Sequence, residues 1–262
     1  MTPYKYLPLC LALFASASAE VIFTEDYETE APIGTSPYKA SALRPEYNEP
    51  DKAAIIVGAS DNLAGSGKAI YLLDLMGGSS DSVSLEYDFA DSPNSQLSAF
   101  RIDFGFAKGG IETEKKDRLF FGAGEFKGSN STKMNAVARR FFQVEFIDTG
   151  RIKFNSTSGS DSKEDVALNG KNTVSIFVND YDSNSIQYTH PITQQTISLG
   201  PNMVAYYLNG EYVLETNLDL DDKTSKGTVG TSENNFGRMG FYSSTTSDNN
   251  AWVFDDLKVT RL

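Results

Sequence analysis

The sequence predicts an all-β fold, a two-sheet antiparallel jelly-roll sandwich. About a dozen short segments rich in Val, Ile, Phe and Tyr alternate apolar and polar residues, which is the pattern of half-buried strands. Clusters of Gly, Asn, Asp and Ser separate these segments, and no window has the period of a long amphipathic helix. The chain has 262 residues, a length that suits one large sandwich.

The first 19 residues have the layout of a signal peptide. Lys5 is the only charged residue before Glu20, and an apolar run from Leu7 to Phe14 is followed by small residues that end in Ala17-Ser18-Ala19. The apolar run is shorter than the roughly 20 residues that a membrane span requires. We therefore expect cleavage before Glu20, a secreted or periplasmic product without a membrane span, and a single jelly-roll domain over residues 20–262.

Charge and cysteine content exclude several classes of function. Acidic residues outnumber basic residues by 35 to 23, which gives a formal net charge of -12. Nucleic-acid binding needs a basic surface, so we expect no nucleic-acid partner. Cys10 is the only cysteine and lies within the predicted leader, so the exported chain has no disulfide and no thiol for catalysis. Its stability must come from core packing, from a metal, or from both.

The predicted strands follow one another along the whole chain. The clearest are Ser82–Phe89 and Phe100–Phe106, in which apolar and polar residues alternate strictly. A turn or two of helix is expected only at Met134–Arg140. The other predicted strands are Val21–Tyr27, Ala54–Val57, Ala69–Leu75, Arg118–Gly122, Arg140–Ile147, Arg151–Phe154, Thr173–Asn179, Val204–Leu208, Tyr212–Thr216, Gly237–Tyr242 and Trp252–Thr260.

Two connections have the sequence of tight hairpin turns. Asn209-Gly210 lies between two apolar runs, and this pair suits a type I′ turn because both central residues need a positive φ. Asp148-Thr149-Gly150 predicts a second, slightly longer turn. The polar stretches Asn155–Asn172 and Asp219–Asn235 are expected to form long loops or loop-rich hairpins.

The two ends of the chain resemble the concanavalin A-like or laminin G-like jelly-roll superfamily. The opening segment Phe23–Glu28 reads FTEDYE, and the closing segments Gly237–Tyr242 and Trp252–Val259 read GRMGFY and WVFDDLKV. In that superfamily an acidic-aromatic first strand pairs with a last strand that contains Asp-Asp between apolar residues. The hairpin Tyr207–Glu211 is similar to an interior hairpin of the same superfamily. The resemblance implies a fold, and a fold does not determine a function.

The resemblance also implies a structural Ca²⁺ ion where the first and last strands meet. Calcium takes about six to eight oxygen ligands, and carboxylates supply them well. The predicted ligands are Asp26, Glu28 and Asp255, and Glu25 and Asp256 are alternates. The alternative is that these acids are solvated residues at strand ends.

Catalytic candidates are few. His190 is the only histidine, and the chain has no Gly-x-Ser-x-Gly elbow, so neither a His-rich zinc site nor a familiar serine hydrolase site is expected. The lyases of the superfamily abstract a proton with Tyr or His and neutralise the uronate with Arg. The resemblance thus implies Tyr188 or His190 as base, with Arg101, Arg139 or Arg140 neutralising.

A glycoside hydrolase needs two carboxylates across the scissile bond. Glu145 is the best starting point for such a pair, but Phe146, Ile147 and Asp148 follow it. The Glu-x-Asp-x-x-Glu strand of the jelly-roll glucanases is therefore not present, which disfavours this reaction.

Carbohydrate recognition needs fewer specialised residues than catalysis does, because aromatic rings stack on sugars and polar side chains bind the hydroxyls. The candidate ligand-binding residues are Tyr206, Tyr207, Arg139 and Trp252, although Trp252, at the start of the last strand, also suits the core. We therefore predict a secreted, calcium-stabilised, polysaccharide-binding protein whose partner is a glycan.

Two other functions stay open at this point. One is a polysaccharide lyase or glycoside hydrolase that acts in the concave groove of a sheet, and the other is an adhesion or structural module that binds protein. Convergence of Arg101, Arg140, Tyr188 and His190 in one cleft would favour the enzyme, and their separation would favour the binding protein.

Overall fold

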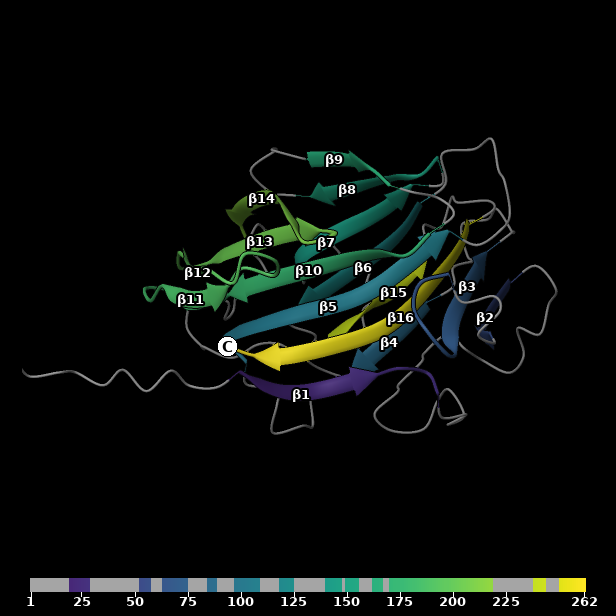
Figure 1. Cartoon of the computed structure of the whole chain (residues 1–262), viewed down its shortest axis with the longest axis horizontal. Coiled ribbons are helices and arrows are strands. Elements are labelled where there is room, and N and C mark those ends of the chain that lie inside the picture. Colours follow the sequence, from purple (N-terminus) through teal and green to yellow (C-terminus); the bar gives the residue numbers. More distant parts are fainter. Residues whose placement is uncertain are drawn as a thin grey trace, which may run out of the picture.

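The computed structural model describes part of the chain, and that part is built from β-strands alone (Figure 1). The described residues are 19–28, 52–57, 63–74, 84–88, 97–108, 118–124, 140–147, 149–155, 162–166, 170–218, 238–243 and 250–262. Within these ranges there is no helix with the length and apolar character needed to cross a membrane.

Sixteen strands are assigned in these ranges. They are β1 (Glu20–Glu25), β2 (Lys52–Val57), β3 (Ala69–Asp74), β4 (Ser84–Asp88), β5 (Ala99–Lys108), β6 (Arg118–Gly124), β7 (Arg140–Ile147), β8 (Arg151–Asn155), β9 (Ser162–Asp165), β10 (Asn172–Asn179), β11 (Ile186–Thr189), β12 (Thr196–Leu199), β13 (Met203–Leu208), β14 (Glu211–Asn217), β15 (Arg238–Ser243) and β16 (Asn250–Arg261).

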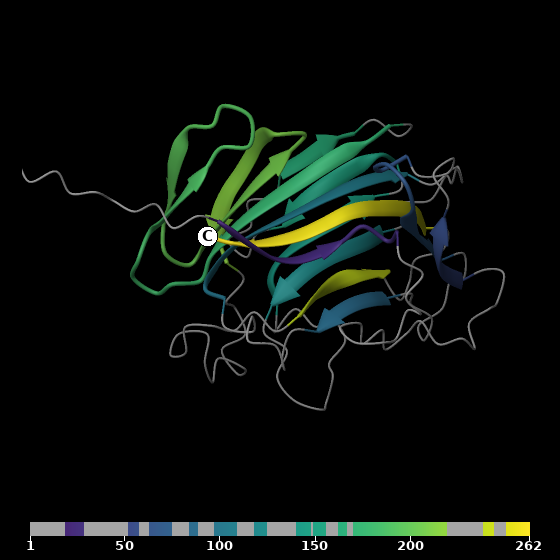
Figure 2. The same ribbon diagram turned by 60° about the horizontal axis from the view of Figure 1, so that its bottom comes forward.

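The strands form two antiparallel sheets that pack face to face (Figure 2). The large sheet has the order β14-β13-β10-β5-β16-β3-β2, and β1 also pairs with β16. The smaller sheet has the order β4-β15-β6-β7-β8-β9, and β11 and β12 form a separate hairpin. The predicted fold class, a two-sheet antiparallel jelly-roll sandwich, is confirmed.

The last strand joins the two ends of the chain. In its first half, β16 pairs with β3, and in its second half it pairs with β1, from Leu257 opposite Glu25 to Arg261 opposite Glu20. A β-bulge separates the two halves, and Asp256 within it has a φ of 53°. The predicted pairing of the first and last strands is therefore confirmed.

The core between the sheets centres on the ring of Phe104 in β5. Its ring centroid lies 4.8 Å from that of Phe121 and 5.6 Å from that of Phe241, both in the smaller sheet. It also lies 6.1 Å from the ring of Phe254 in β16. All four side chains are at least 98% buried. Such aromatic pairs add about 0.5–1.5 kcal/mol each to the gain from burial.

Each strand predicted from the sequence has a counterpart in the structure, and the two turns are also confirmed. Asn209 and Gly210 have φ values of 52° and 80°, as a type I′ turn requires, and Gly150 has a φ of 82° between β7 and β8. Residues 134–139 lie outside the described residues. Three strands were not predicted, β9, β11 and β12; each has only four residues.

Replacing Phe104 with Ala should destabilise the protein by about 3–5 kcal/mol, because it opens a cavity where both sheets meet. Phe120→Ala is the matched control, since Phe120 is only partly buried and stacks on Tyr242 at a centroid distance of 5.0 Å outside the main core. Urea unfolding of both variants measures the two losses. Equal losses would contradict the central place of Phe104 in the core.

Candidate functional site

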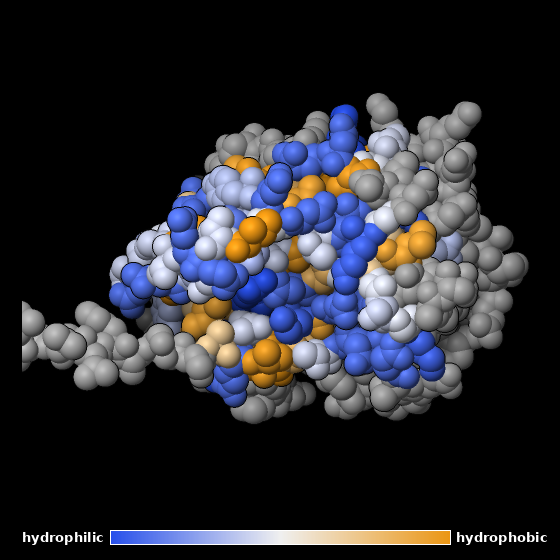
Figure 3. All heavy atoms as spheres, viewed as in Figure 1, coloured by the Kyte–Doolittle hydropathy of each residue, from blue (hydrophilic) through white to orange (hydrophobic). Residues whose placement is uncertain are grey.

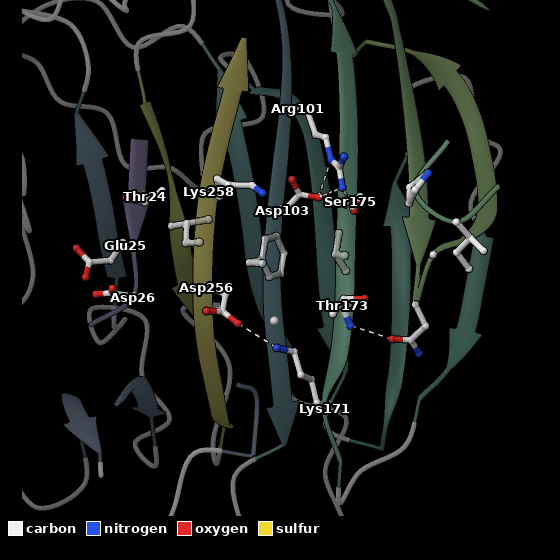
Figure 4. Close-up of a pocket in the computed structure, with 18 residues that line it drawn as sticks. Thr24, Glu25, Asp26, Arg101, Asp103, Lys171, Thr173, Ser175, Asp256 and Lys258 are labelled. Atoms are coloured by element: carbon white, nitrogen blue, oxygen red, sulfur yellow. Dashed lines mark hydrogen bonds and ion pairs between the residues drawn. The ribbon is translucent and has the colours of Figure 1, made fainter. Parts of the chain in front are cut away.

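A groove crosses the outer face of the large sheet, on the side away from the core (Figures 3 and 4). Its volume is about 730 Å³, and it is lined in turn by residues of β1, β16, β5 and β10 and by the β13–β14 turn. Pro191 and Ile192, from the turn between β11 and β12, form one rim. Hydrophilic residues cover the centre of this face in Figure 3.

Strand alternation explains why the lining is polar. On β5 the side chains of Phe100, Ile102 and Phe104 point into the core and are fully or almost fully buried. Successive side chains of a strand point to opposite faces, so Arg101 and Asp103 lie on the outer face. The same rule places Ser175 of β10 beside Asp103, because these two residues are Cα partners in the sheet.

Arg101, Asp103 and Ser175 form a hydrogen-bonded cluster at the centre of the groove (Figure 4). Arg101 donates to Oδ1 of Asp103 from Nε at 2.7 Å and from Nη2 at 2.6 Å. The Ser175 hydroxyl donates to the same Oδ1 at 2.6 Å. The guanidinium carbon of Arg101 also lies over the ring of Phe177, 5.0 Å from its centroid, in a cation–π contact.

The second carboxylate oxygen of Asp103, Oδ2, takes no part in this cluster. Oδ2 is shielded from solvent, and no residue in the described ranges hydrogen-bonds to it. A buried polar atom without a partner costs free energy, so a ligand donor that reaches Oδ2 after neighbouring side chains shift would recover that cost.

Two lysines complete the charged lining. Nζ of Lys171 lies 3.0 Å from Oδ2 of Asp256, the bulge residue of β16, and both side chains are about half exposed. Lys258 is the Cα partner of Asp103 across β16 and β5, and in Figure 4 it reaches from β16 toward Asp103. Within the described part of the chain, the Lys258 ammonium has no hydrogen-bond or ion-pair partner.

Backbone close approaches fix the walls of the groove. A Cβ atom on Gly105 would collide with the carbonyl oxygen of Ala64, so the chain around Ala64 packs directly on the outer face of β5. At the other side, Asn209 of the type I′ turn accepts a hydrogen bond on Oδ1 from the Thr173 N–H at 2.8 Å. The walls are thus held by contacts that do not depend on a ligand.

The predicted base residues lie beside the groove but do not line it. Tyr188 is 3% exposed, and its hydroxyl forms a 2.8 Å hydrogen bond with that of Tyr207. Burial raises the pKa of Tyr188 well above its ordinary value of 10.0, and the bond with Tyr207 adds to this. Nδ1 of His190 accepts hydrogen bonds from the N–H groups of Ile192 and Thr193 at 3.1 and 3.2 Å. His190 thereby shapes the rim.

The remaining predicted residues are spread over the molecule. Arg140 begins β7 in the smaller sheet, and Arg139 lies outside the described residues. Glu145, also on β7, is 3% exposed and pairs with Arg118 at 2.9 Å. Of the predicted catalytic residues, only Arg101 lines the groove.

Three aromatic candidates for sugar stacking are buried. Tyr206 and Trp252 are 0% exposed and lie in the core between the sheets. Tyr207 lies on the outer face, but the rings of Tyr188, His190 and Tyr212 surround it and leave it 1% exposed. Rings with no accessible face cannot stack on a sugar, so the structure gives these residues a packing role.

The predicted calcium ligands lie near the corner where β1 meets β16. Asp255 is fully buried, and a Cβ on Gly65 would collide with its carboxylate. Glu28 accepts a hydrogen bond from the Lys68 N–H at 2.7 Å. Burial raises the pKa of Glu25, and the charges of Asp26 and Asp255 raise it further.

These acids do not form a ready ligand set. Among the described residues there is no group of three or more Asp, Glu, His or Cys side chains arranged to hold a metal ion. Asp26 Oδ1 instead accepts a hydrogen bond from the Glu28 N–H at 3.1 Å. Calcium binding by Asp26, Glu28 and Asp255 therefore stays a prediction from the sequence.

Comparison with known proteins supports the fold. No protein-family model and no curated protein matches the sequence. Among solved structures, a carbohydrate esterase from the Shiga toxin-encoding bacteriophage phi24B is similar, with 12% identity, a TM-score of 0.54, and coverage of 93% of this chain and 99% of that one. An endo-β-1,4-glucuronan lyase from the fungus Trichoderma reesei is also similar, with 9% identity, a TM-score of 0.51, and coverage of 92% and 96%. The concanavalin A-like fold predicted from the chain ends is confirmed.

Several residues of the groove were not predicted from the sequence, among them Asp103, Ser175, Lys171 and Lys258. The alternation of Phe100–Phe106 places Asp103 on the same face as Arg101, so Asp103 could have been predicted from the sequence pattern. Ser175 and Lys258 come from other strands, and only the pairing register brings them beside Asp103. Lys171 precedes β10 and lies beside Asp256 instead.

Tyr188→Phe should reduce stability by about 1 kcal/mol at neutral pH, because it removes the hydrogen bond to Tyr207. The pKa of Tyr188 is raised in the folded state, so its stabilising contribution is complete below pH 10 and is lost as the pH rises above that value. The difference between variant and wild type should therefore shrink above about pH 10. Urea unfolding at several pH values measures it, with Tyr181→Phe as control. A difference that grows above pH 10 would contradict the raised pKa.

The calcium prediction is tested by melting the protein with and without EDTA. A Ca²⁺ ion held at about 100 times its Kd adds about 2.7 kcal/mol, so its removal should lower the melting temperature by about 5–10 °C. Added Ca²⁺, but not Mg²⁺, should restore the original value. An unchanged melting temperature in EDTA would refute the prediction.

Proposed function

We propose that the protein binds a polysaccharide chain in the groove on the outer face of the large sheet. The groove itself carries the proposal: it has a volume of about 730 Å³ and presents hydroxyl, amide and charged groups. Ligand sites are concave and place a few polar groups where they fix the orientation of the ligand. Asp103, Ser175 and Lys258 are such groups, and the sheet holds them in place.

The direction of the groove favours a chain over a single sugar. It runs from β1 across β16, β5 and β10 to the turn after β13, so it crosses the strands. Adjacent strands lie about 4.8 Å apart, and four such spacings make about 19 Å. An extended oligosaccharide can contact the whole length, whereas one sugar ring would contact only a part.

Binding is favoured over bond cleavage by the positions of the candidate catalytic residues. Arg101 lines the groove, but Tyr188 is buried against Tyr207 and Arg140 begins a strand of the other sheet. The ring nitrogen Nδ1 of His190 is occupied by two backbone N–H groups. The four residues expected of a lyase therefore do not converge in the groove.

The comparisons support carbohydrate as the ligand class. Two similar structures with TM-scores above 0.5 are named as a carbohydrate esterase and a glucuronan lyase. These names describe those proteins, and the shared fold does not transfer their reactions to this chain. We further propose a secreted or periplasmic location, for which the signal-peptide pattern of residues 1–19 is the support.

Native affinity electrophoresis in gels that contain single polysaccharides tests the function. The intact protein should be retarded by at least one polysaccharide, and the polymer should not be shortened or gain unsaturated ends. Thr173→Trp places a large ring in the groove, so it should reduce the apparent affinity by at least about 10-fold.

Thr149→Trp is the matched control, because Thr149 is exposed in the β7–β8 turn of the smaller sheet. It should be retarded like the wild type. Retardation by none of the polysaccharides would contradict the proposed function. Release of unsaturated or shortened products would identify a lyase or hydrolase instead.

A further inference from the structure

The charges of the groove are nearly balanced. Its lining contains three basic side chains and four acidic ones: Arg101, Lys171 and Lys258, and Glu25, Asp26, Asp103 and Asp256. Arg101 and Lys171 are already ion-paired within the groove, with Asp103 and Asp256. The cluster of arginines that an acidic chain needs for polyanions is not present in the described part of the groove.

Asp103 and Lys258 offer a free acceptor next to a free donor. They are Cα partners on adjacent antiparallel strands and lie on the same face, where facing Cβ atoms are about 4.5–5.5 Å apart. Asp103 uses Oδ1 for Arg101 and Ser175 and leaves Oδ2 without a partner in the described structure. Lys258 does not pair with Asp103 although it reaches toward it (Figure 4).

From this arrangement we propose that Asp103 and Lys258 together recognise adjacent hydroxyl groups of an uncharged sugar. The partly exposed Lys258 side chain shifts when the sugar binds and opens access to Oδ2 of Asp103. One hydroxyl then donates to Oδ2, and the neighbouring oxygen accepts from the Lys258 ammonium. This inference rests on the proposed function of the groove and names the class of glycan, a neutral polysaccharide. Arg101 and Ser175 are positioning residues, because they hold Oδ1 and so orient Oδ2.

A uronate fits this pair less well than a diol does. Its carboxylate would be attracted by Lys258 but would also lie next to the carboxylate of Asp103, and like charges repel at such distances. A hydroxyl can donate and accept at once, so it satisfies both groups. Because Oδ2 is shielded from solvent, the hydrogen bond forms where water competes weakly.

Isothermal titration calorimetry with defined hexasaccharides tests the pair. The neutral probes are cellohexaose, xylohexaose and mannohexaose, and the anionic probes are hexamers of glucuronic, galacturonic and mannuronic acid. We expect the wild type to bind at least one neutral probe at least about 10-fold more tightly than any anionic probe. Asp103→Asn and Lys258→Met should each lower the affinity for that neutral probe by about 10- to 100-fold, because each removes one hydrogen bond to a charged group.

Asp103→Asn also gives a readout that misfolding cannot imitate. It removes the negative charge but keeps an oxygen for Arg101 and Ser175, so binding of the anionic probes should strengthen while binding of the neutral probe weakens. The controls are Asp165→Asn, which changes an exposed acid paired with Arg151 at 2.9 Å, and Lys153→Met on β8. Both lie on the smaller sheet and should bind as the wild type does.

The outcomes separate the two proposals. If both variants bind the neutral probe as tightly as the wild type does, the proposed role of Asp103 and Lys258 is contradicted, but the polysaccharide-binding function is not. A wild-type protein that binds an anionic probe more tightly than any neutral probe would also contradict the role of the pair without contradicting polysaccharide binding. Binding of no probe of either kind, together with no retardation by any polysaccharide in gels, would contradict the proposed function and the pair with it.

Discussion

The packing of Phe104 against both sheets is the interaction on which the groove depends. This ring contacts Phe121 and Phe241 in the smaller sheet and Phe254 in β16, so it fixes which face of β5 is turned to the core. Because successive residues of a strand point to opposite faces of the sheet, the adjacent residues Asp103 and Gly105 must lie on the outer face. The polar floor of the groove is therefore a direct consequence of the aromatic core on the other side of the same strand.

The β-bulge in β16 is the second constraint. Before the bulge, the even-numbered Trp252 and Phe254 point into the core, and after it the odd-numbered Leu257 and Val259 do so. The extra residue between Asp255 and Lys258, where Asp256 and Leu257 both lie opposite Phe104, reverses the parity, as bulges do. Without it Lys258 would face the core. The bulge also lies where β16 changes its partner from β3 to β1, so one irregularity joins the chain ends and supplies a groove residue.

Much of the fold could be predicted from the sequence, because alternation and turn residues are local signals. The strands of Phe100–Phe106 and Trp252–Thr260 and the Asn209-Gly210 turn are examples. The short strands β11 and β12 were missed, because four residues with a mixed pattern, IQYT and TISL, carry little signal. These two strands cover Tyr207, which a sequence pattern alone would leave accessible to a ligand.

The candidate site was harder to predict, because alternation separates two faces without saying which one is buried. Tyr206 and Trp252 were therefore ligand candidates until the packing placed them in the core. The grouping of Ser175 and Lys258 around Asp103 depends on the register of three strands, which are distant in the sequence. Four groove residues were named in advance: Arg101 as a uronate-neutralising residue, and Asp26, Glu25 and Asp256 as calcium ligands or alternates.

Chemical-shift mapping by NMR tests most directly whether the outer face of the large sheet is the ligand-binding face. The ¹⁵N-labelled protein is titrated with cellohexaose, xylohexaose and mannohexaose in turn. For a hexasaccharide that binds, the amide signals of Arg101, Asp103, Thr173, Ser175 and Lys258 should shift, and those of β7 and β8 should not. Shifts confined to β7, β8 and their neighbours in the smaller sheet would contradict the proposal.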